Sequence, residues 1–209
     1  MLNEGKLPCH PGLFQVLDPR RGRLFMIKGA MPPTLQLILG GARSGKSRYA
    51  LGQPGELSAG NRIFIATALA EDEEMKKRIE LHRTVRENHW QTLEEPYHLA
   101  EALERAAVSP GNLVVVDCLT LWISNLLCGK GGKTLTPEES REAFKGFLHT
   151  LPKLAGTIRL VSNEVGLGIV PATPLGRHFR DLQGELNQAV AVLAGEVILM
   201  TAGIPQKIK

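Results

Sequence analysis

The sequence is poor in aromatic residues and cysteine and has no long apolar run, and each shortage excludes a class of protein. Phe, Trp and Tyr make up 5% of the 209 residues, which is few for the base-stacking surfaces of a nucleic-acid motor. The three cysteines form no C-x-x-C pair, so neither a disulfide framework nor a zinc site is expected. No apolar run approaches the roughly 18 residues of a membrane helix, and the amino terminus lacks a signal-peptide pattern. We therefore expect a cytoplasmic protein without a membrane span.

Basic residues exceed acidic ones, but they form no long runs. The formal net charge is +4, and a scattered positive charge of this size favours phosphate-bearing ligands over a nucleic-acid surface. We therefore expect nucleotides rather than nucleic acid as partners. The hydrophobic content of 43% suffices for one substantial core in a chain of this length.

The chain divides into a short irregular beginning and a long patterned remainder. Residues 1–33 contain several prolines and glycines and the basic cluster "DPRRGR", and they show no sustained hydrophobic period. We predict an N-terminal lead-in of unknown role there, with Met31 as an alternative start. Over residues 34–209, short apolar runs alternate with longer amphipathic segments, which predicts β-α units and a single domain. The expected fold class is α/β, with three layers and a mainly parallel sheet.

The expected elements follow from this alternation. Strands rich in Val, Ile and Leu are predicted at 35–39, 62–68, 112–117, 157–162 and 196–202. Helices are predicted at 45–58, 72–87, 96–107, 119–128, 137–150 and 175–194. Thr136 followed by Pro137 is typical of a helix N-cap with proline in the first turn.

The stretch "GGARSGKS" matches the phosphate-binding pattern G-x-x-x-x-G-K-[ST] and lies between a predicted strand and a predicted helix. Its glycines allow the backbone to approach a polyphosphate, the lysine neutralises β- and γ-phosphate charge, and the serine hydroxyl is a magnesium ligand. A glycine-rich turn without a ligand is the alternative, and the complete strand-motif-helix context disfavours it. The motif predicts a P-loop NTPase-type fold and a nucleotide-binding site formed by Gly40, Gly41, Ala42, Arg43, Ser44, Gly45, Lys46 and Ser47.

A second acidic residue is expected to act with Ser47 on magnesium. "NLVVVD" places Asp117 at the end of a buried strand, where P-loop proteins hold a metal-binding carboxylate. We predict Ser47 and Asp117 as the Mg²⁺ ligands. The alternative is that Asp117 is the N-cap of the following helix.

The remaining motifs separate the classes of P-loop protein. No N-K-x-D guanine-reading motif occurs, and the only D-x-x-G, "DLQG" at 181–184, falls inside a predicted helix. A switch GTPase is therefore disfavoured, and a metabolic kinase or nucleotidyltransferase is the best class. The rival interpretation is a P-loop NTPase that acts as a nucleic-acid- or protein-binding switch.

Several separated blocks together resemble the bifunctional adenosylcobinamide kinase and adenosylcobinamide-phosphate guanylyltransferase family of cobalamin biosynthesis, from about Leu35 to Lys209. The blocks are "GGARSGKSRYA", "IATA", "DEEMKKRIELHRTVRENHW", "EEP", "VVVDCLTLWISNLL", "VSNEVGLGIVPATPLGRHFRDLQGELNQ" and "AGIPQKIK". The resemblance implies that ATP or GTP phosphorylates adenosylcobinamide. GMP is then transferred from GTP through a guanylyl-histidine, giving adenosylcobinamide-GDP. The resemblance also implies a homotrimer.

The family pattern R-I-x-x-H, which carries the histidine that accepts GMP, is matched by "RIELH" and so implies His82. A neutral imidazole is a competent nucleophile near pH 7, and Arg83 and Arg86 are placed to stabilise charge on the α-phosphate. His82 also continues the apolar spacing of Met75 and Ile79, so a packed structural histidine is the alternative. His89 is the nearest competing nucleophile.

The other aligned positions complete the implied nucleotide site. Besides the P-loop, the resemblance implies nucleotide contacts by Ala66, Thr67, Ala68, Arg83, Thr84, Val85, Arg86, Glu94 and Asp117. The alternatives for Glu94 are a solvated loop charge and an acid at the start of a helix. The chain departs from the family at Leu81, where a second histidine is common, and at 86–90, which lacks a proline. Asn163 and Glu164 are either ligand contacts or turn caps and are not counted among the site residues.

Overall fold

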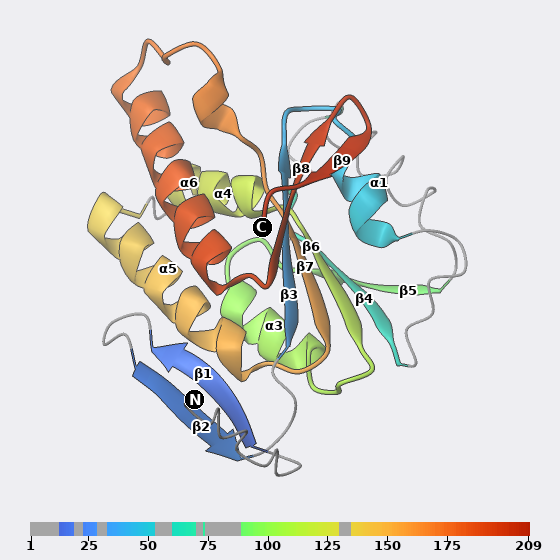
Figure 1. Ribbon diagram of the computed structural model, residues 1–209. Coiled ribbons are helices and arrows are strands. Elements are labelled where there is room, and N and C mark those ends of the chain that lie inside the picture. The colour runs from blue at the N-terminus through green and yellow to red at the C-terminus, as the bar shows by residue number, and fades with distance from the viewer. Residues whose placement is uncertain are drawn as a thin grey trace, which may run out of the picture.

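The structure, a computed structural model, describes residues 13–18, 23–28, 33–52, 60–69, 73, 89–129 and 135–209. A seven-stranded sheet forms its centre (Figure 1). The strands are β3 (Thr34–Gly40), β4 (Arg62–Ala66), β5 (Trp90–Glu94), β6 (Leu113–Asp117), β7 (Thr157–Val161), β8 (Glu196–Thr201) and β9 (Ile204–Lys207). The helices are α1 (Lys46–Leu51), α3 (Leu99–Ala106), α4 (Leu119–Cys128), α5 (Pro137–Thr150) and α6 (Pro174–Leu193), with short 3-10 helices η1 (Leu151–Lys153) and η2 (Val165–Leu167).

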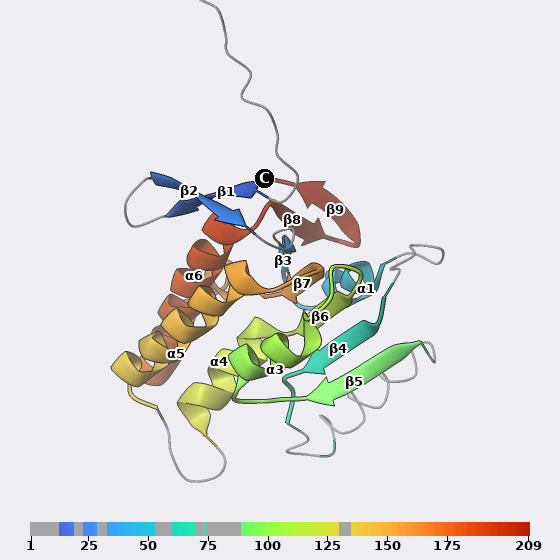
Figure 2. The same ribbon diagram turned by 90° about the horizontal axis from the view of Figure 1, so that it is seen from below.

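The strand order is β5-β4-β6-β7-β3-β8-β9, and every pairing is parallel except that of β8 with β9. Helices α3, α4, α5 and α6 cover one face of the sheet, and α1 covers the other (Figures 1 and 2). This arrangement confirms the predicted α/β fold with a mainly parallel sheet.

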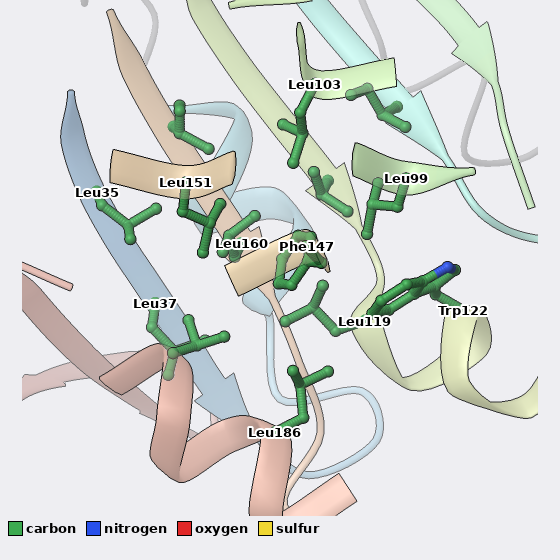
Figure 3. Packing of buried hydrophobic residues seen from close by; sticks show 14 of the residues in the cluster. Leu35, Leu37, Leu99, Leu103, Leu119, Trp122, Phe147, Leu151, Leu160 and Leu186 are labelled. Carbon is green, nitrogen blue, oxygen red and sulfur yellow. The ribbon is translucent and has the colours of Figure 1, made fainter. Parts of the chain in front are cut away.

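Strand β3 is buried on both faces, which explains its continuous apolar sequence. Leu35, Leu37 and Leu39 pack with the larger helical layer, whereas Ile38 packs on the side of α1. In the larger core, the ring centroids of Trp122 and Phe147 lie 5.1 Å apart. Leucines from strands and helices surround the two rings (Figure 3). The two layers hold β3, and therefore the loop that follows it, in a rigid frame.

Two strands of the sheet were not predicted. β5 lies at the sheet edge with only Trp90 and Leu93 partly buried, and β9 is exposed along its whole length and contains Pro205. Neither segment has an apolar run, because edge strands bury little surface. Their pairing is decided by the neighbouring strand rather than by their own pattern.

Helix boundaries agree where local capping is strong. α4 and α5 have the predicted bounds, and Thr136 forms a capping box in which its hydroxyl accepts from Glu139 N–H at 3.2 Å. The helix predicted at 45–58 was too long, because Gly52, with φ 86°, ends α1 after Leu51. The helix predicted at 72–87 lies, apart from Glu73, outside the described residues.

Within the lead-in, β1 (Leu13–Asp18) and β2 (Arg23–Lys28) pair antiparallel as a separate two-stranded sheet. This hairpin was not predicted, although two six-residue, largely apolar segments joined by a short linker with Pro19 and Gly22 are a recognised hairpin signal. The hairpin lies at the amino-terminal side of β3, away from the loop that follows that strand (Figure 1). In the described part of the chain, no helix combines the length and the apolar character needed to cross a membrane.

Candidate active site

The carboxyl ends of five parallel strands meet at one edge of the sheet and bring the predicted site positions together. Ala66 of β4 is in register with Glu94 of β5 and with Asp117 of β6. Asp117 is in register with Val161 of β7, and Val161 with Ile38, two residues before the P-loop. Ligands of parallel α/β sheets bind at this edge. Sequence positions spread over more than 70 residues thus form one row.

The P-loop has a backbone that requires glycine at two positions. Gly40 has φ 145°, and a Cβ there would clash with the carbonyl oxygen of Met200. Gly45 has φ 95° and is the N-cap residue of α1. These conformations turn the chain sharply from β3 into α1. The loop therefore has the local shape that the motif predicts.

Lys46 is buried, and its ammonium group lies inside the curve of this loop. Its Nζ donates to the Gly41 carbonyl and lies 3.4 Å from Ser44 Oγ, while Gly41, Ala42 and Arg43 are exposed. A cation held among backbone groups at an open rim suits the binding of an anionic polyphosphate.

Two distant segments hold the P-loop from either side. Glu164 N–H, after β7, donates to the Gly40 carbonyl at 3.2 Å. Gly203 N–H, in the turn between β8 and β9, donates to the Ser44 carbonyl at 3.0 Å. Neither contact was predicted from the sequence. The turn before β9 was not recognised as part of the sheet, and Glu164 was expected to be either a ligand contact or a turn cap. The "AGIPQKIK" block therefore supports the P-loop.

Thr67 is fully buried and joins the ends of β4 and β6. Its Oγ1 accepts from Cys118 N–H at 2.8 Å and donates to the Cys118 carbonyl at 2.8 Å. The Thr67 carbonyl accepts from Asn125 Nδ2 at 2.7 Å. Thr67 thus aligns the two strand ends, whereas its partly exposed neighbours Ala66 and Ala68 are accessible to a ligand.

Asp117 lies at the end of β6, but it is not the N-cap of α4, because Cys118 occupies that position. Burial, and secondly the negative charge of Asp117, raise the pKa of the Cys118 thiol to about 12. The Asp117 carboxylate is therefore close to the first turn of α4 without capping it. The capping alternative is not supported.

We expect the two described cysteines to differ strongly in reactivity. The Cys118 pKa of about 12 lies above the ordinary value of 9.0, so the native thiol stays protonated up to strongly alkaline pH, whereas Cys128 is exposed. In a Cys9→Ser background, iodoacetamide at pH 8 should modify Cys128 and leave Cys118 intact until guanidinium unfolds the protein, as mass spectrometry would show. The Cys118 pKa is 9.0 without burial, as in the unfolded chain, and about 12 in the folded protein. The free energy of unfolding therefore falls as pH rises from about 9 towards 12, because only the unfolded chain releases this proton there. Equal modification of both thiols in the native protein would contradict the predicted difference in reactivity.

Glu94 lies at the exposed carboxyl end of β5, four strands from β3. At about 4.8 Å per strand spacing, this places it roughly 19 Å from the P-loop strand. The next residue, Glu95, holds the approach to α3, because its Oε1 accepts from Tyr97 N–H at 3.1 Å and His98 N–H at 2.8 Å. Glu94 therefore lies in the row of site residues but at its far end.

His89 precedes the amino end of β5, next to Trp90, whose ring packs edge-on against Phe64 with centroids 6.4 Å apart. Because β5 runs parallel to β4, this end faces away from the P-loop edge. The five residues of β5 separate His89 from that edge by roughly 16 Å. This placement disfavours His89 as a nucleophile.

Five predicted residues lie outside the described part of the chain: His82, Arg83, Thr84, Val85 and Arg86. The described residues 67–69 follow the carboxyl end of β4, so the chain enters this segment from the edge that carries the P-loop. It re-enters the described part at His89.

Glu164 belongs to the site by position, although sequence analysis did not count it. Besides its contact with Gly40, its carboxylate Oε1 accepts from Asn187 Nδ2 at 3.1 Å. The sequence signal was the polar "SNE" that directly follows a buried strand.

Among the described residues, no group of three or more His, Cys, Asp or Glu side chains could hold a metal ion. The hydroxyl of Ser47 and the carboxylate of Asp117 are hard oxygen donors, which suit a Mg²⁺ ion carried by a triphosphate with few protein ligands.

Comparison with known proteins gives one consistent result. The family model described as "Cobinamide kinase / cobinamide phosphate guanyltransferase" matches residues 36–208. The bifunctional adenosylcobalamin biosynthesis protein CobP of Pseudomonas aeruginosa is 48% identical over 174 residues, which cover 83% of this chain and 96% of that protein. The corresponding CobU proteins of Escherichia coli and Salmonella typhimurium are 40% and 39% identical, each over 83% of this chain and 98% of theirs.

Proposed function

The chain belongs to the cobinamide kinase / cobinamide phosphate guanyltransferase family, and from this premise we propose how its residues divide the two reactions. It is a bifunctional kinase and nucleotidyltransferase of cobalamin biosynthesis. It phosphorylates adenosylcobinamide and then transfers GMP from GTP to the product. The family match over residues 36–208 favours this function over a nucleic-acid- or protein-binding switch, and we assign both activities to one domain, residues 34–209.

The observation that carries the assignment of the site is the row of predicted residues along the carboxyl edge of β3, β6, β4 and β5. At one end, Gly40–Ser47 binds the triphosphate, with Lys46 neutralising phosphate charge. Glu94 is too far from the P-loop strand to contact the same phosphates, so we assign it, with Ala66 and Ala68, to the nucleoside. Thr67 acts chiefly by aligning β4 with β6.

Magnesium accompanies the triphosphate, and we propose Ser47 and Asp117 as its protein ligands. When bound, the ion neutralises charge on the phosphates during transfer. The residues contribute oxygen donors only, consistent with an ion that arrives with the nucleotide.

His82 is proposed to carry GMP between GTP and the corrinoid. Its Nε2 or Nδ1 lone pair attacks the α-phosphorus, the bond to the bridging oxygen breaks, and pyrophosphate leaves with that electron pair. We further propose that Arg83, Thr84, Val85 and Arg86 line the guanine nucleotide, with the two arginines stabilising the α-phosphate charge. The placement of His89 at the opposite edge of the sheet supports His82 by removing its nearest competitor.

We also propose that the protein works as a homotrimer. Apolar side chains are strongly exposed at the end of η2 and just after it, where Leu167 is 83% and Ile169 95% exposed. Such surfaces are typically covered by another molecule, which supports association or substrate contact at this segment.

The two-step function is tested with the wild-type protein. Incubation with α-labelled GTP and magnesium, without corrinoid, should leave acid-labile, alkali-stable label on the denatured chain. Addition of adenosylcobinamide and ATP should transfer that label to a corrinoid product, resolved by chromatography. A protein that binds GTP but never becomes labelled would contradict the covalent mechanism.

A further inference from the structure

A buried polar network joins the end of β7 to α6. Ser162, Gln183 and Asn187 are all buried, and they bond to one another through side chains. Ser162 Oγ donates to Asn187 Oδ1 at 2.7 Å and accepts from Gln183 Nε2 at 2.7 Å. Gln183 Nε2 also lies 3.0 Å from Asn187 Oδ1. These contacts fix the orientation of the Asn187 amide, since its oxygen must face Ser162 and Gln183.

The amide nitrogen of Asn187 therefore points the other way, toward the P-loop side of the strand end. It donates to the Asn163 carbonyl at 3.1 Å and to Glu164 Oε1 at 3.1 Å. Glu164 N–H in turn donates to the Gly40 carbonyl at 3.2 Å. One carboxylate oxygen of Glu164 is thus held by Asn187, and its backbone is tied to the first glycine of the P-loop.

This network costs more than the apolar contact that would join the same two elements. Polar side chains lose hydration on burial, and the Gln183 Oε1 atom is buried without a hydrogen-bond partner. An apolar contact, such as those made by Leu182, Leu186 and Val190 elsewhere on α6, would avoid that cost. The benefit is a fixed position for Glu164, which matches the way that enzymes orient a reacting carboxylate through a second layer of hydrogen bonds.

We propose that Glu164 is the base of the kinase reaction and that Asn187 is its positioning residue, an inference that rests on the proposed function. The hydroxyl oxygen of adenosylcobinamide forms a bond to the γ-phosphorus. The bond from that phosphorus to the β,γ-bridging oxygen breaks, and its electron pair leaves with the nucleoside diphosphate. The hydroxyl proton passes to the Glu164 carboxylate and then to solvent.

The other two acidic residues of the edge have other proposed roles, Asp117 on magnesium and Glu94 at the nucleoside. β7 is adjacent to β3, whereas β6 with Asp117 is two strands away and β5 with Glu94 is four. At about 4.8 Å per spacing, the ends of β6 and β5 lie roughly 10 and 19 Å from β3. The Glu164 N–H bond to the Gly40 carbonyl ties the residue after β7 directly to the first glycine of the P-loop. Of the three strands, β7 is thus the one whose carboxyl end lies beside the P-loop strand.

The Glu164→Gln variant tests the proposal, because it removes the charge while keeping an oxygen to accept from Asn187. We expect the kinase kcat, measured as transfer of γ-labelled phosphate from ATP to adenosylcobinamide, to fall about 10²- to 10³-fold. Covalent labelling by α-labelled GTP, which needs no hydroxyl proton acceptor, should stay within about threefold of wild type.

Two further variants complete the test. Asn187→Ala should lower the kinase kcat about tenfold and leave the labelling intact, a ratio that loss of folding would not produce. Glu185→Gln, an exposed carboxylate on the same helix that pairs with Arg141 at 3.1 Å, is the matched control and should leave both activities unchanged. Retention of kinase activity in Glu164→Gln would overturn the proposal, as would an equal loss of both activities. A wild-type protein without either activity would instead refute the proposed function.

Discussion

Replacing His82 with alanine is expected to abolish the covalent label that the wild-type protein acquires from α-labelled GTP. Alanine has no lone pair to attack the α-phosphorus, so the GMP-protein intermediate cannot form at this position. Transfer of GMP to adenosylcobinamide phosphate should fall by at least about 10³-fold, as is usual when a covalent nucleophile is removed. The label is measured on denatured protein after gel separation, and the transfer by chromatography of the corrinoid product.

His89→Ala is the matched control for this variant. His89 lies at the amino end of β5, on the side of the sheet away from the P-loop, so its loss should leave the label unchanged. The kinase step should also survive in His82→Ala, since it needs no histidine. Persistent label in His82→Ala, or its loss in His89→Ala, would move the nucleophile to another residue.

Replacing Lys46 with alanine is expected to impair both reactions together. The Lys46 ammonium lies inside the P-loop, between the Gly41 carbonyl and Ser44 Oγ, where it neutralises the phosphate charge on which each reaction depends. We expect kcat/KM to fall by about 10²- to 10³-fold for phosphorylation and for guanylylation. The two assays described above measure this directly, and calorimetry with GTP measures the loss of binding.

Lys145→Ala provides the control for a general loss of positive charge. Lys145 is an exposed residue of α5 that pairs with Glu142 one turn away. Helix α5 lies on the opposite side of the sheet from α1, the helix that follows the P-loop (Figure 1). Its removal should leave both activities and nucleotide affinity unchanged. If Lys46→Ala lost one reaction only, a second triphosphate site would be required.

The features predicted correctly from sequence are those that depend on local interactions. β3 is recognisable because burial on both faces demands a continuous apolar run, and the P-loop because Gly40 and Gly45 adopt conformations that other residues avoid. α5 has its predicted bounds because Thr136 and Glu139 cap each other within one turn. In each case the physical cause lies within a few residues of the pattern.

The features that were missed depend on partners far along the chain. β9 has an exposed sequence with a proline, and it forms a strand because β8 pairs with it after a tight turn. Glu164 looked like either a turn cap or a ligand contact. Its orientation comes from Asn187, 23 residues later, whose own amide is fixed by buried partners.

By itself, the sequence determined the fold class, the P-loop, and a family resemblance that made His82 the candidate carrier of GMP. Only the tertiary structure brought Ala66, Glu94 and Asp117 into one row, placed His89 at the opposite edge, and tied Glu164 to Gly40. The reason is that parallel strands place their carboxyl ends side by side whatever their distance in sequence. Which strands are neighbours is decided by packing of the whole sheet between its two helical layers.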